Sequence, residues 1–424
     1  MDARQAFRAE WIIDGVSQQP LRGCALVVQG ATIVGITPVS ELPADVRVID
    51  LGQCTLLPGL IDSHVHLVDD GSPRPRGLVE AESGGMTLLR AAQRATESLR
   101  GGVTALRDMG APNGVIPTLK DAVRAGVVEG PTILTCDTQL TITGSYGRRE
   151  NVLGREVDGA DGMRIAVRRL FKDGADFVKL MASGQVSNAG AGLEAAQFTP
   201  AEMDAAVDEA HRLGRTVAVH AVGLKSIEAS VAAGVDCIEH GNFLTGELAD
   251  RMAAQGIFLV PTLLPYQVLS HPPAELKLAD DVRRKSMAAW EKSLEAVVLA
   301  RKAGVRIGAG TDSGGPCIPH NSVAREVKLL EQAGLSAMEA IQSATRTNAQ
   351  ILGLAGAGTL EPGKAADLLA VQGDLLGDLD AIERVRLVLK AGRRVGGMPV
   401  RTAATRDPEQ GRYLGEDSAF SCRC

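Results

Sequence analysis

Two histidines stand two residues apart in the segment LIDSHVHL, at His64 and His66. If this segment is a β-strand, residues i and i+2 point to the same face, so both imidazoles can bind one metal ion. By itself a His-x-His pair is a weak signal, because ordinary strands also contain it. A metal site therefore requires that other parts of the chain bring further ligands to the same place.

Three further residues have side chains suited to such a site. His220 lies in TVAVHAV and His240 in CIEHG, and each, taken singly, is typical of a core histidine bonded to a backbone carbonyl. Asp312, in GAGTDSGG, is also compatible with a turn or a helix N-cap. Together with the His-x-His pair, however, these side chains form a ligand set that suits zinc or a similar first-row ion.

Lys179 is the most informative residue, because it interrupts the apolar segment FVKLM. Burying a charged ammonium is costly, and the ordinary alternative is a lysine that extends its head group to the rim of the fold. Between metal-bound histidines, a neutral amine can instead react with carbon dioxide to form a carbamate. The two carbamate oxygens can bridge two cations.

The surrounding segments predict how these residues are positioned. From about residue 58 to 356, short apolar runs alternate with helical stretches that end on Gly, such as AEMDAAVDEAHRLG, and this alternation indicates a parallel sheet. The expected strands are LLPGLIDSHVH, GVTALRD, PTILTC, DFVKLM, TVAVHAV, CIEHG, IFLVPTLL and VRIGAGTD. Eight units favour an α/β fold with a closed (β/α)8 TIM barrel over an open doubly wound sheet. Active sites of such barrels lie at the C-terminal ends of the strands, so five strands direct these candidate ligands to one mouth.

Both chain ends have a different character. Residues 24–37 alternate around a Gly as in a β-hairpin, and residues 366–372 and 384–395 also predict strands. Seven scattered cysteines argue against a disulfide framework, and Cys422 and Cys424 are assigned to a frayed tail rather than to a metal site. Short strands therefore flank the barrel on both sides in sequence.

Composition narrows the class of partner. Apolar residues make up 45% of the chain, and 45 Lys and Arg stand against 51 Asp and Glu, which favours neither disorder nor a nucleic-acid interface. The N-terminus lacks the apolar core of a signal peptide, and no apolar run reaches the roughly 18 residues that cross a bilayer. We expect a soluble, cytoplasmic protein with a small-molecule or dipeptide-like substrate and without nucleic-acid or membrane contacts.

The combined motif set resembles the amidohydrolase superfamily, binuclear carboxylated-lysine subtype. PGLIDSHVH, GVTALRDMG, GPTILT, FVKLMASG, VAVHAVG, IEHGNFL and GTDSG are similar to the imidazolonepropionase-like and Xaa-Pro dipeptidase-like branch. That branch includes metal-dependent carboxypeptidases, dipeptidases and ochratoxin-type amidases. The resemblance extends from about residue 10 to 400.

The resemblance implies two divalent ions. Zinc is expected first, and the ligand set also tolerates manganese, cobalt or iron. His64, His66 and Asp312 would hold one ion, His220 and His240 the second, and N6-carboxylated Lys179 would bridge both; Asp312, Lys179 and His240 count as catalytic. The expected divisions are residues 1–57 and 357–402 as the two parts of a small composite β-sandwich, 58–356 as the barrel, and 403–424 as a tail. A homo-oligomer is also implied.

The expected reaction is hydrolysis of an amide bond by a metal-bridging hydroxide, with Asp312 as base and then as proton donor to the leaving nitrogen. The substrate would present a C-terminal peptide bond, an N-acyl amino acid or an amide mimic such as ochratoxin; a cyclic amide, carbamate or ester is the alternative. A mononuclear deaminase would not need Lys179. A binding protein that had lost catalysis would typically have lost some of the six metal ligands.

Candidate substrate residues lie on the loops after the strands. Tyr146, in TITGSYG, stands where relatives of this branch tend to have His, and Gln185 stands where they often have Gly. His320 either lines the substrate site or holds a loop, and Tyr266 either binds a substrate carboxylate or packs within its loop. Arg148 and Arg149 could also bind a substrate carboxylate through charge-assisted bonds, but solvated surface arginines are more common. His211 and His271 are assigned to structure and surface.

Overall fold

The computed structural model describes residues 3–145, 152–187, 192–398, 402–406 and 413–416. The chain divides into two compact units. The first unit contains residues 1–61, 97–105 and 337–424, and the second contains residues 62–96 and 106–336. The sequence-based limits at residues 57, 356 and 402 stay a prediction.

The first unit is built from two sheets, and both chain ends contribute strands to each of them. One sheet has the order β20-β19-β5-β1-β3-β4, with the strands Arg4–Arg8 (β1), Cys24–Gln29 (β3), Thr32–Pro38 (β4), Arg47–Asp50 (β5), Thr402–Arg406 (β19) and Tyr413–Glu416 (β20). The other has the order β18-β17-β16-β6-β2, with Trp11–Ile12 (β2), Cys54–Pro58 (β6), Leu368–Gln372 (β16), Val385–Lys390 (β17) and Arg393–Gly396 (β18). The expected hairpin is confirmed, because β3 pairs antiparallel with β4.

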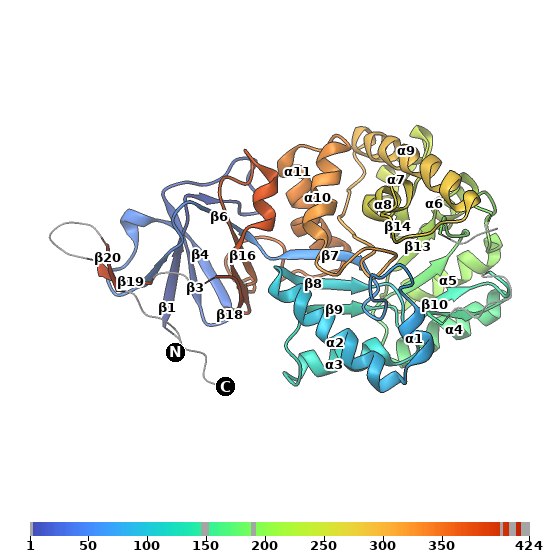
Figure 1. Cartoon of the computed structure of the whole chain (residues 1–424), viewed down its shortest axis with the longest axis horizontal. Coiled ribbons are helices and arrows are strands. Elements are labelled where there is room, and N and C mark those ends of the chain that lie inside the picture. The colour runs from blue at the N-terminus through green and yellow to red at the C-terminus, as the bar shows by residue number, and fades with distance from the viewer. Residues whose placement is uncertain (1–2, 146–151, 188–191, 399–401, 407–412, 417–424) are drawn as a thin grey trace. The chain divides into compact units, whose positions relative to one another are not determined.

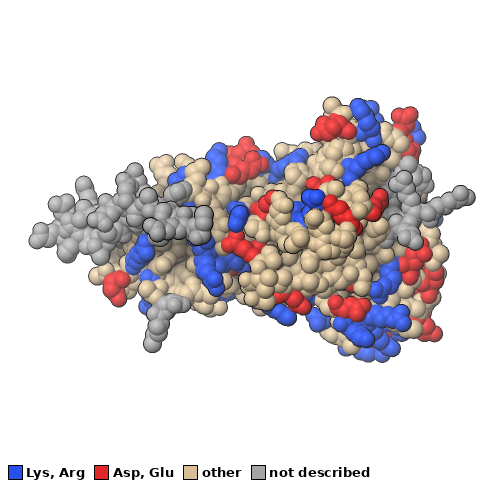
Figure 2. Space-filling model, turned by 60° about the horizontal axis from the view of Figure 1, so that its bottom comes forward, with Lys and Arg blue, Asp and Glu red and all other residues tan. Residues whose placement is uncertain are grey.

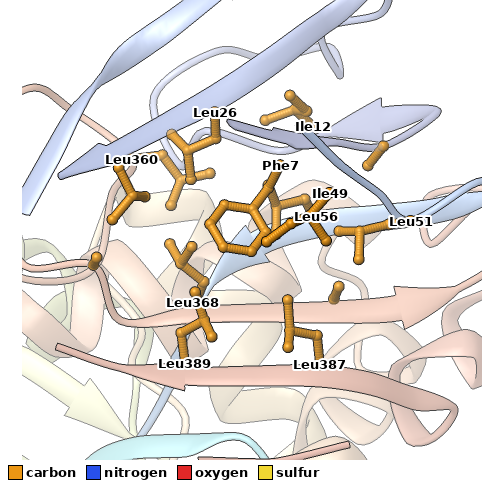
Figure 3. Packing of buried hydrophobic residues seen from close by; sticks show 14 of the residues in the cluster. Phe7, Ile12, Leu26, Ile49, Leu51, Leu56, Leu360, Leu368, Leu387 and Leu389 are labelled. Atoms are coloured by element: carbon orange, nitrogen blue, oxygen red, sulfur yellow. The ribbon is translucent and has the colours of Figure 1, made fainter. Parts of the chain in front are cut away.

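The core of this unit lies between the two sheets. Phe7 and Leu26 of one sheet and Leu56 and Leu368 of the other belong to one buried apolar cluster, and Figure 3 shows their side chains facing one another. Alternate residues of β3, β6, β16 and β17 supply this layer, as expected of sheets that pack face to face. The predicted β-sandwich is therefore present and is composed of both chain ends.

The second unit contains most of the parallel strands of the barrel, and the first residues of β7 and β8 belong to the first unit. Three strands pair in the order β7-β8-β9, and six more in the order β11-β10-β12-β13-β14-β15. Their bounds are Leu60–Val65 (β7), Val103–Asp108 (β8), Thr132–Thr135 (β9), Gln139–Thr141 (β10), Gly154–Glu156 (β11), Val178–Met181 (β12), Val217–Ala221 (β13), Cys237–His240 (β14) and Phe258–Val260 (β15). Hydrogen bonds connect the two groups, since Asp176 donates its N–H to the carbonyl of Thr135 at 2.7 Å.

The segment 306–313 takes the place of the eighth strand, although it forms only isolated bridges rather than the continuous strand that was expected. On one side Gly308 donates its N–H to the carbonyl of Leu259 in β15. On the other side Ser63 of β7 donates its N–H to the carbonyl of Ala309, and Asp312 donates to that of His64. The segment is thus bonded to neighbours on both sides, as in a (β/α)8 barrel.

Helices alternate with these strands and lie around their outer side (Figure 1). Their bounds are Gly77–Ala81 (α1), Gly84–Arg100 (α2), Val115–Arg124 (α3), Ala160–Lys172 (α4), Pro200–Arg212 (α5), Leu224–Ala233 (α6), Gly246–Gln255 (α7), Leu263–Ser270 (α8), Asp280–Ala303 (α9) and Val323–Gln332 (α10). Local sequence fixes some of the ends. Helix α5 begins with a capping box between Thr199 and Glu202, and α7 ends at Gly256 in the left-handed conformation, which glycine adopts without steric cost.

The expected start of the first barrel strand is wrong. The residues LLP of the first expected strand belong to β6, which pairs with β16 of the sandwich, so the first barrel strand begins only at Leu60. The helical segments Ala337–Gln342 (α11), Ser343–Thr347 (η2) and Asn348–Ile351 (α12) belong to the first unit, where Asn348 donates its side-chain N–H to the carbonyl of Ile61 at 2.6 Å. The placement of β6 and the placement of these helical segments both involve contacts between residues far apart in the sequence.

The surface is mixed in charge. On the face shown in Figure 2, Lys and Arg side chains alternate with Asp and Glu, and no broad region of that face carries one sign. Within the described parts of the chain, no helix combines the length and apolar character needed to cross a membrane.

Candidate metal centre

The six expected ligands come together at the C-terminal ends of the barrel strands. His64 lies in β7 with His66 just beyond it, His220 lies in β13, and His240 is the last residue of β14. Lys179 is the second residue of β12 and pairs in register with Ala218 of β13. Ala218 lies two residues before His220, so Lys179 lies farther from the C-terminal ends of the strands than His220 does. All six are at least half buried, and the Asp312 side chain is the most open of them, at 23% exposure.

The distances show one compact group. The Asp312 carboxylate lies 3.6 Å from His64 Nε2 and 3.5 Å from His66 Nε2. The rings of His220 and His240 are 4.5 Å apart, and those of His64 and His240 are 5.2 Å apart. Ligand atoms of His64, His240 and Asp312 all lie within 4.8 Å of one another. This trio draws on both expected ligand sets, so the two sets adjoin.

Lys179 has the properties that the carbamate requires. Its side chain is 1% exposed, and none of the described residues offers its Nζ a hydrogen-bond partner. Burial lowers its pKa from the usual value, since removing the amine from water disfavours the charged form. A buried amine without a partner, placed among four imidazoles and a carboxylate, fits a bridging carbamate in a two-ion site.

A buried ion pair orients His64. Its Nδ1 lies 2.8 Å from Glu239 Oε2, and the other oxygen of Glu239 accepts a hydrogen bond from Arg107 Nη2 at 2.7 Å. A carboxylate only accepts hydrogen bonds, so Nδ1 carries the proton and Nε2 keeps the lone pair that a metal needs. The Arg107 side chain is held in turn by the carbonyl of Ser63 at 2.7 Å.

Thr262 orients His240 in the same way. The Thr262 hydroxyl donates to the carbonyl of Pro261 at 2.8 Å, so its oxygen accepts from His240 Nδ1 at 2.6 Å. His240 Nε2 is then unprotonated. Thr262 has φ of 45°, which is uncommon for a β-branched residue, and His240 and Asp312 also have positive φ. Such strained backbone is concentrated at functional sites.

The four imidazoles are neutral near pH 7. Burial lowers the pKa of His66 and of His220 to about 3, and it lowers the pKa of His64 and His240 well below the usual value. Neutral imidazole is the form that binds metal ions. His220 Nε2 lies 3.3 Å from the carbonyl of Gly184, which leaves Nδ1 as its ligand atom.

Comparison with known proteins agrees with the expected superfamily. The family model "Amidohydrolase family" matches residues 55–395. The chain belongs to the amidohydrolase family. It is therefore a hydrolase acting on carbon–nitrogen bonds.

Individual relatives place the chain in the expected branch of the superfamily. Ochratoxinase from Aspergillus niger is 29% identical, over 87% of this chain and 82% of the relative. Imidazolonepropionase from Pseudomonas putida is 27% identical, over 85% of this chain and 90% of the relative. The crystal structure of a Xaa-Pro dipeptidase with bound methionine in the active site has a TM-score of 0.84 and 30% identity, and the match covers 92% of this chain and 99% of that one.

Sequence reasoning did not assign a role to Arg107, Glu239 or Thr262. The first two share a signal with Lys179, because each is a charged residue that directly follows apolar residues in a buried strand. Thr262 shows no comparable signal, since a single Thr in PTLLP is unremarkable in composition. Its role depends on the fold that brings it to His240.

The expected substrate residues differ in position. Tyr266, in α8, lies edge-on to His240 with 5.8 Å between the ring centroids. Gln185 is half-buried and follows Gly184, whose carbonyl contacts His220. His320 contacts the loop after β7, where its Nε2 lies 2.9 Å from the carbonyl of Asp69.

The remaining weaker candidates lie elsewhere. Tyr146, Arg148 and Arg149 fall outside the described residues. His211 is 42% exposed and contacts Asp236, and His271 contacts Ser270, so neither joins the metal-binding group.

Proposed function

We propose that this amidohydrolase cleaves an amide bond in a small substrate, either a C-terminal peptide bond, an N-acyl amino acid or an amide mimic such as ochratoxin. The ochratoxinase and Xaa-Pro dipeptidase similarities support this substrate class. The methionine in the dipeptidase structure supports an amino-acid moiety on one side of the bond. Zinc as the metal and a homo-oligomeric state stay predictions.

The ligand set suits two divalent ions. His64, His66 and Asp312 would hold one, and His220 and His240 the other. Lys179 would bridge them after its neutral Nζ forms a bond to the carbon of carbon dioxide and loses a proton, which leaves a carbamate anion. When bound, such ions acidify a water molecule so that it can serve as the nucleophile, and they polarise the scissile carbonyl.

Residues of the chain complete the reaction. Asp312, whose carboxylate is the most open group of the ligand set, accepts the proton of the attacking water and passes it to the leaving nitrogen. Tyr266 stays protonated, because burial raises the pKa of its phenol well above the usual value. Its hydroxyl can therefore donate to a substrate carbonyl or carboxylate.

The observation that carries the proposal is the environment of Lys179. A buried lysine amine without a hydrogen-bond partner among the described residues is unfavourable in a folded protein unless another group satisfies it. Here it lies among five further metal-binding side chains. A bridging carbamate satisfies that environment, whereas a purely structural lysine does not.

The test measures metal content and hydrolysis together. N-Acyl amino acids and dipeptides would be assayed with the wild type and with Lys179→Ala and Lys179→Arg, since a guanidinium cannot form the carbamate. We expect about two ions per chain in the wild type, fewer in both variants, and a loss of kcat/KM of about 100-fold or more. Full activity in either variant, or after complete chelation, would contradict the two-ion mechanism.

A further inference from the structure

A cluster of apolar side chains lies beside the metal centre and has no part in metal binding. Its buried members are Val186, Val222, Tyr266 and Ala289, and its partly buried members are Leu193, Phe243 and Trp290. We call these seven residues the apolar wall. They come from the segments after β12, β13 and β14 and from helices α8 and α9.

The apolar wall lies close to the candidate metal ligands His220 and His240. Val222 follows His220 by two residues and Phe243 follows His240 by three, and Phe243 donates its N–H to the carbonyl of Val222 at 3.2 Å. Tyr266 belongs to the wall and also lies edge-on to His240 at 5.8 Å. A group bound at the metal centre next to His240 therefore meets this wall.

A polar link holds the wall in place. Asn242, directly before Phe243, donates its side-chain N–H to Ser293 Oγ at 2.6 Å and to the carbonyl of Ala289 at 3.3 Å. The loop after β14 is thereby fixed against α9, which also carries Trp290. The backbone segments that carry Phe243 and Trp290 are thus joined by hydrogen bonds within the fold.

The composition of the wall is unusual for this chain. Aromatic residues are only 3% of the sequence, with 7 Phe, 2 Trp and 3 Tyr, and one of each kind lies in the wall. Large apolar groups gain about 25 cal/mol per Å² when they are removed from water, so the partly exposed Phe243 and Trp290 favour an apolar ligand.

We propose that the apolar wall receives the side chain of the C-terminal residue of the substrate and selects large apolar, above all aromatic, residues. This inference rests on the proposed amide hydrolysis. In this proposal the Tyr266 hydroxyl binds the carboxylate of that residue, while the Tyr266 ring belongs to the wall. The carboxylate and the side chain leave the same Cα, so both can contact one region.

The kinetic test varies only the C-terminal residue. N-Acetyl derivatives of Gly, Ala, Leu, Phe, Asp and Lys would be compared by kcat/KM. We expect Phe and Leu to exceed Gly by about 100-fold, and Asp and Lys to fall below Ala. Phe243→Ala and Trp290→Ala should lower kcat/KM for the Phe substrate by about tenfold, equivalent to about 1.4 kcal/mol, and change the Gly substrate by less than about twofold.

Further variants keep the test decisive. Phe243→Leu and Trp290→Phe keep an apolar side chain and should retain most of the preference even if the alanine variants fold poorly. Phe171→Ala, a truncation on the outer helix α4, is the matched control and should leave the preference unchanged. Equal losses on all substrates in the wall variants, or a wild-type preference for Asp or Lys, would overturn the proposal.

Binding can be measured without turnover. Because Trp11 and Trp290 are the two tryptophans of the chain, Trp11→Phe makes Trp290 the sole indole reporter. With chelator present to stop hydrolysis, N-acetyl-phenylalanine should change the emission saturably, and N-acetyl-glycine should not. If no amide is cleaved at all, the proposed function fails; if amides are cleaved without this side-chain dependence and without the fluorescence change, only the wall assignment fails.

Discussion

Replacing Glu239 tests how the barrel interior prepares His64 for a metal ion. Glu239 is fully buried and contacts Arg107 at 2.7 Å through one oxygen and His64 at 2.8 Å through the other. Strand β14 pairs with β13 and β15, not with β7 or β8, so these three side chains meet in the interior of the barrel. One carboxylate therefore neutralises a buried cation and fixes a ligand tautomer.

The magnitude follows from what Glu239→Ala leaves behind. The Arg107 side chain is 3% exposed, and a buried charge that loses its partner typically costs about 3–5 kcal/mol. The His64 N–H also loses its acceptor, and loss of such an outer contact typically weakens metal binding by about 10- to 100-fold. Glu239→Gln should fall between the two proteins, because its amide oxygen can serve only one of the two donors.

The assay is denaturant unfolding of the metal-free protein, together with metal titration against a competing chelator. Arg107→Met combined with Glu239→Leu removes both charges and should recover much of the stability lost in Glu239→Ala, although not the metal affinity. Glu295→Ala, which breaks the exposed pair with Lys292, is the control and should stay within about 1 kcal/mol of the wild type. If Glu239→Ala has the stability of that control and the metal affinity of the wild type, the Arg107–Glu239 pair neither stabilises the fold nor orients His64 for metal binding.

The remaining predictions concern residues near the same centre. Thr262→Ala removes the hydrogen-bond acceptor of His240 Nδ1 and should weaken metal binding by about tenfold. Thr262→Ser keeps the hydroxyl and should keep the metal affinity. Equal affinity of both variants in a metal titration would refute the tautomer assignment. Tyr266→Phe keeps the ring and removes the hydroxyl, so kcat/KM should fall by about tenfold or more with metal content unchanged, and a fall in metal content instead would indicate a structural role. Burial raises the pKa of Glu326 to about 8 from a usual 4.5, so the folded state holds the Glu326 proton more tightly than the unfolded state does. This tighter proton binding stabilises the folded state at low pH, and the stabilisation is lost as pH rises from about 5 to about 8. The unfolding free energy of the wild type should therefore decline over that range relative to that of Glu326→Gln. Urea unfolding at several pH values measures this difference. A relative rise would show that Glu326 is ionised throughout and is held by the N–H groups at the start of α8.

The strand ends and their ligands were accessible from the sequence because local patterns determine them. Residue spacing placed His64 and His66 on one face, and the apolar setting of Lys179 marked it as unusual. Turn and strand signals likewise predicted the hairpin of β3 and β4. These features need only neighbours within a few residues, or the rule that parallel strands end at one mouth.

Other features depended on tertiary structure. The contact between Arg107 and Glu239 joins residues 132 positions apart, and the boundary between β6 and β7 is set by the pairing of β6 with a strand near residue 370. The segment 306–313 is placed by hydrogen bonds to its neighbours rather than by a continuous ladder. Local propensity cannot specify such contacts.

The sequence by itself thus indicated which residues are candidate metal ligands and which fold carries them. Only the tertiary structure decided which nitrogen of His64 and of His240 is available, and which apolar side chains adjoin the ligands. The reason is physical: a histidine ligand is defined by its ring nitrogen, and that nitrogen is selected by a hydrogen-bond partner that the folded chain brings from another strand.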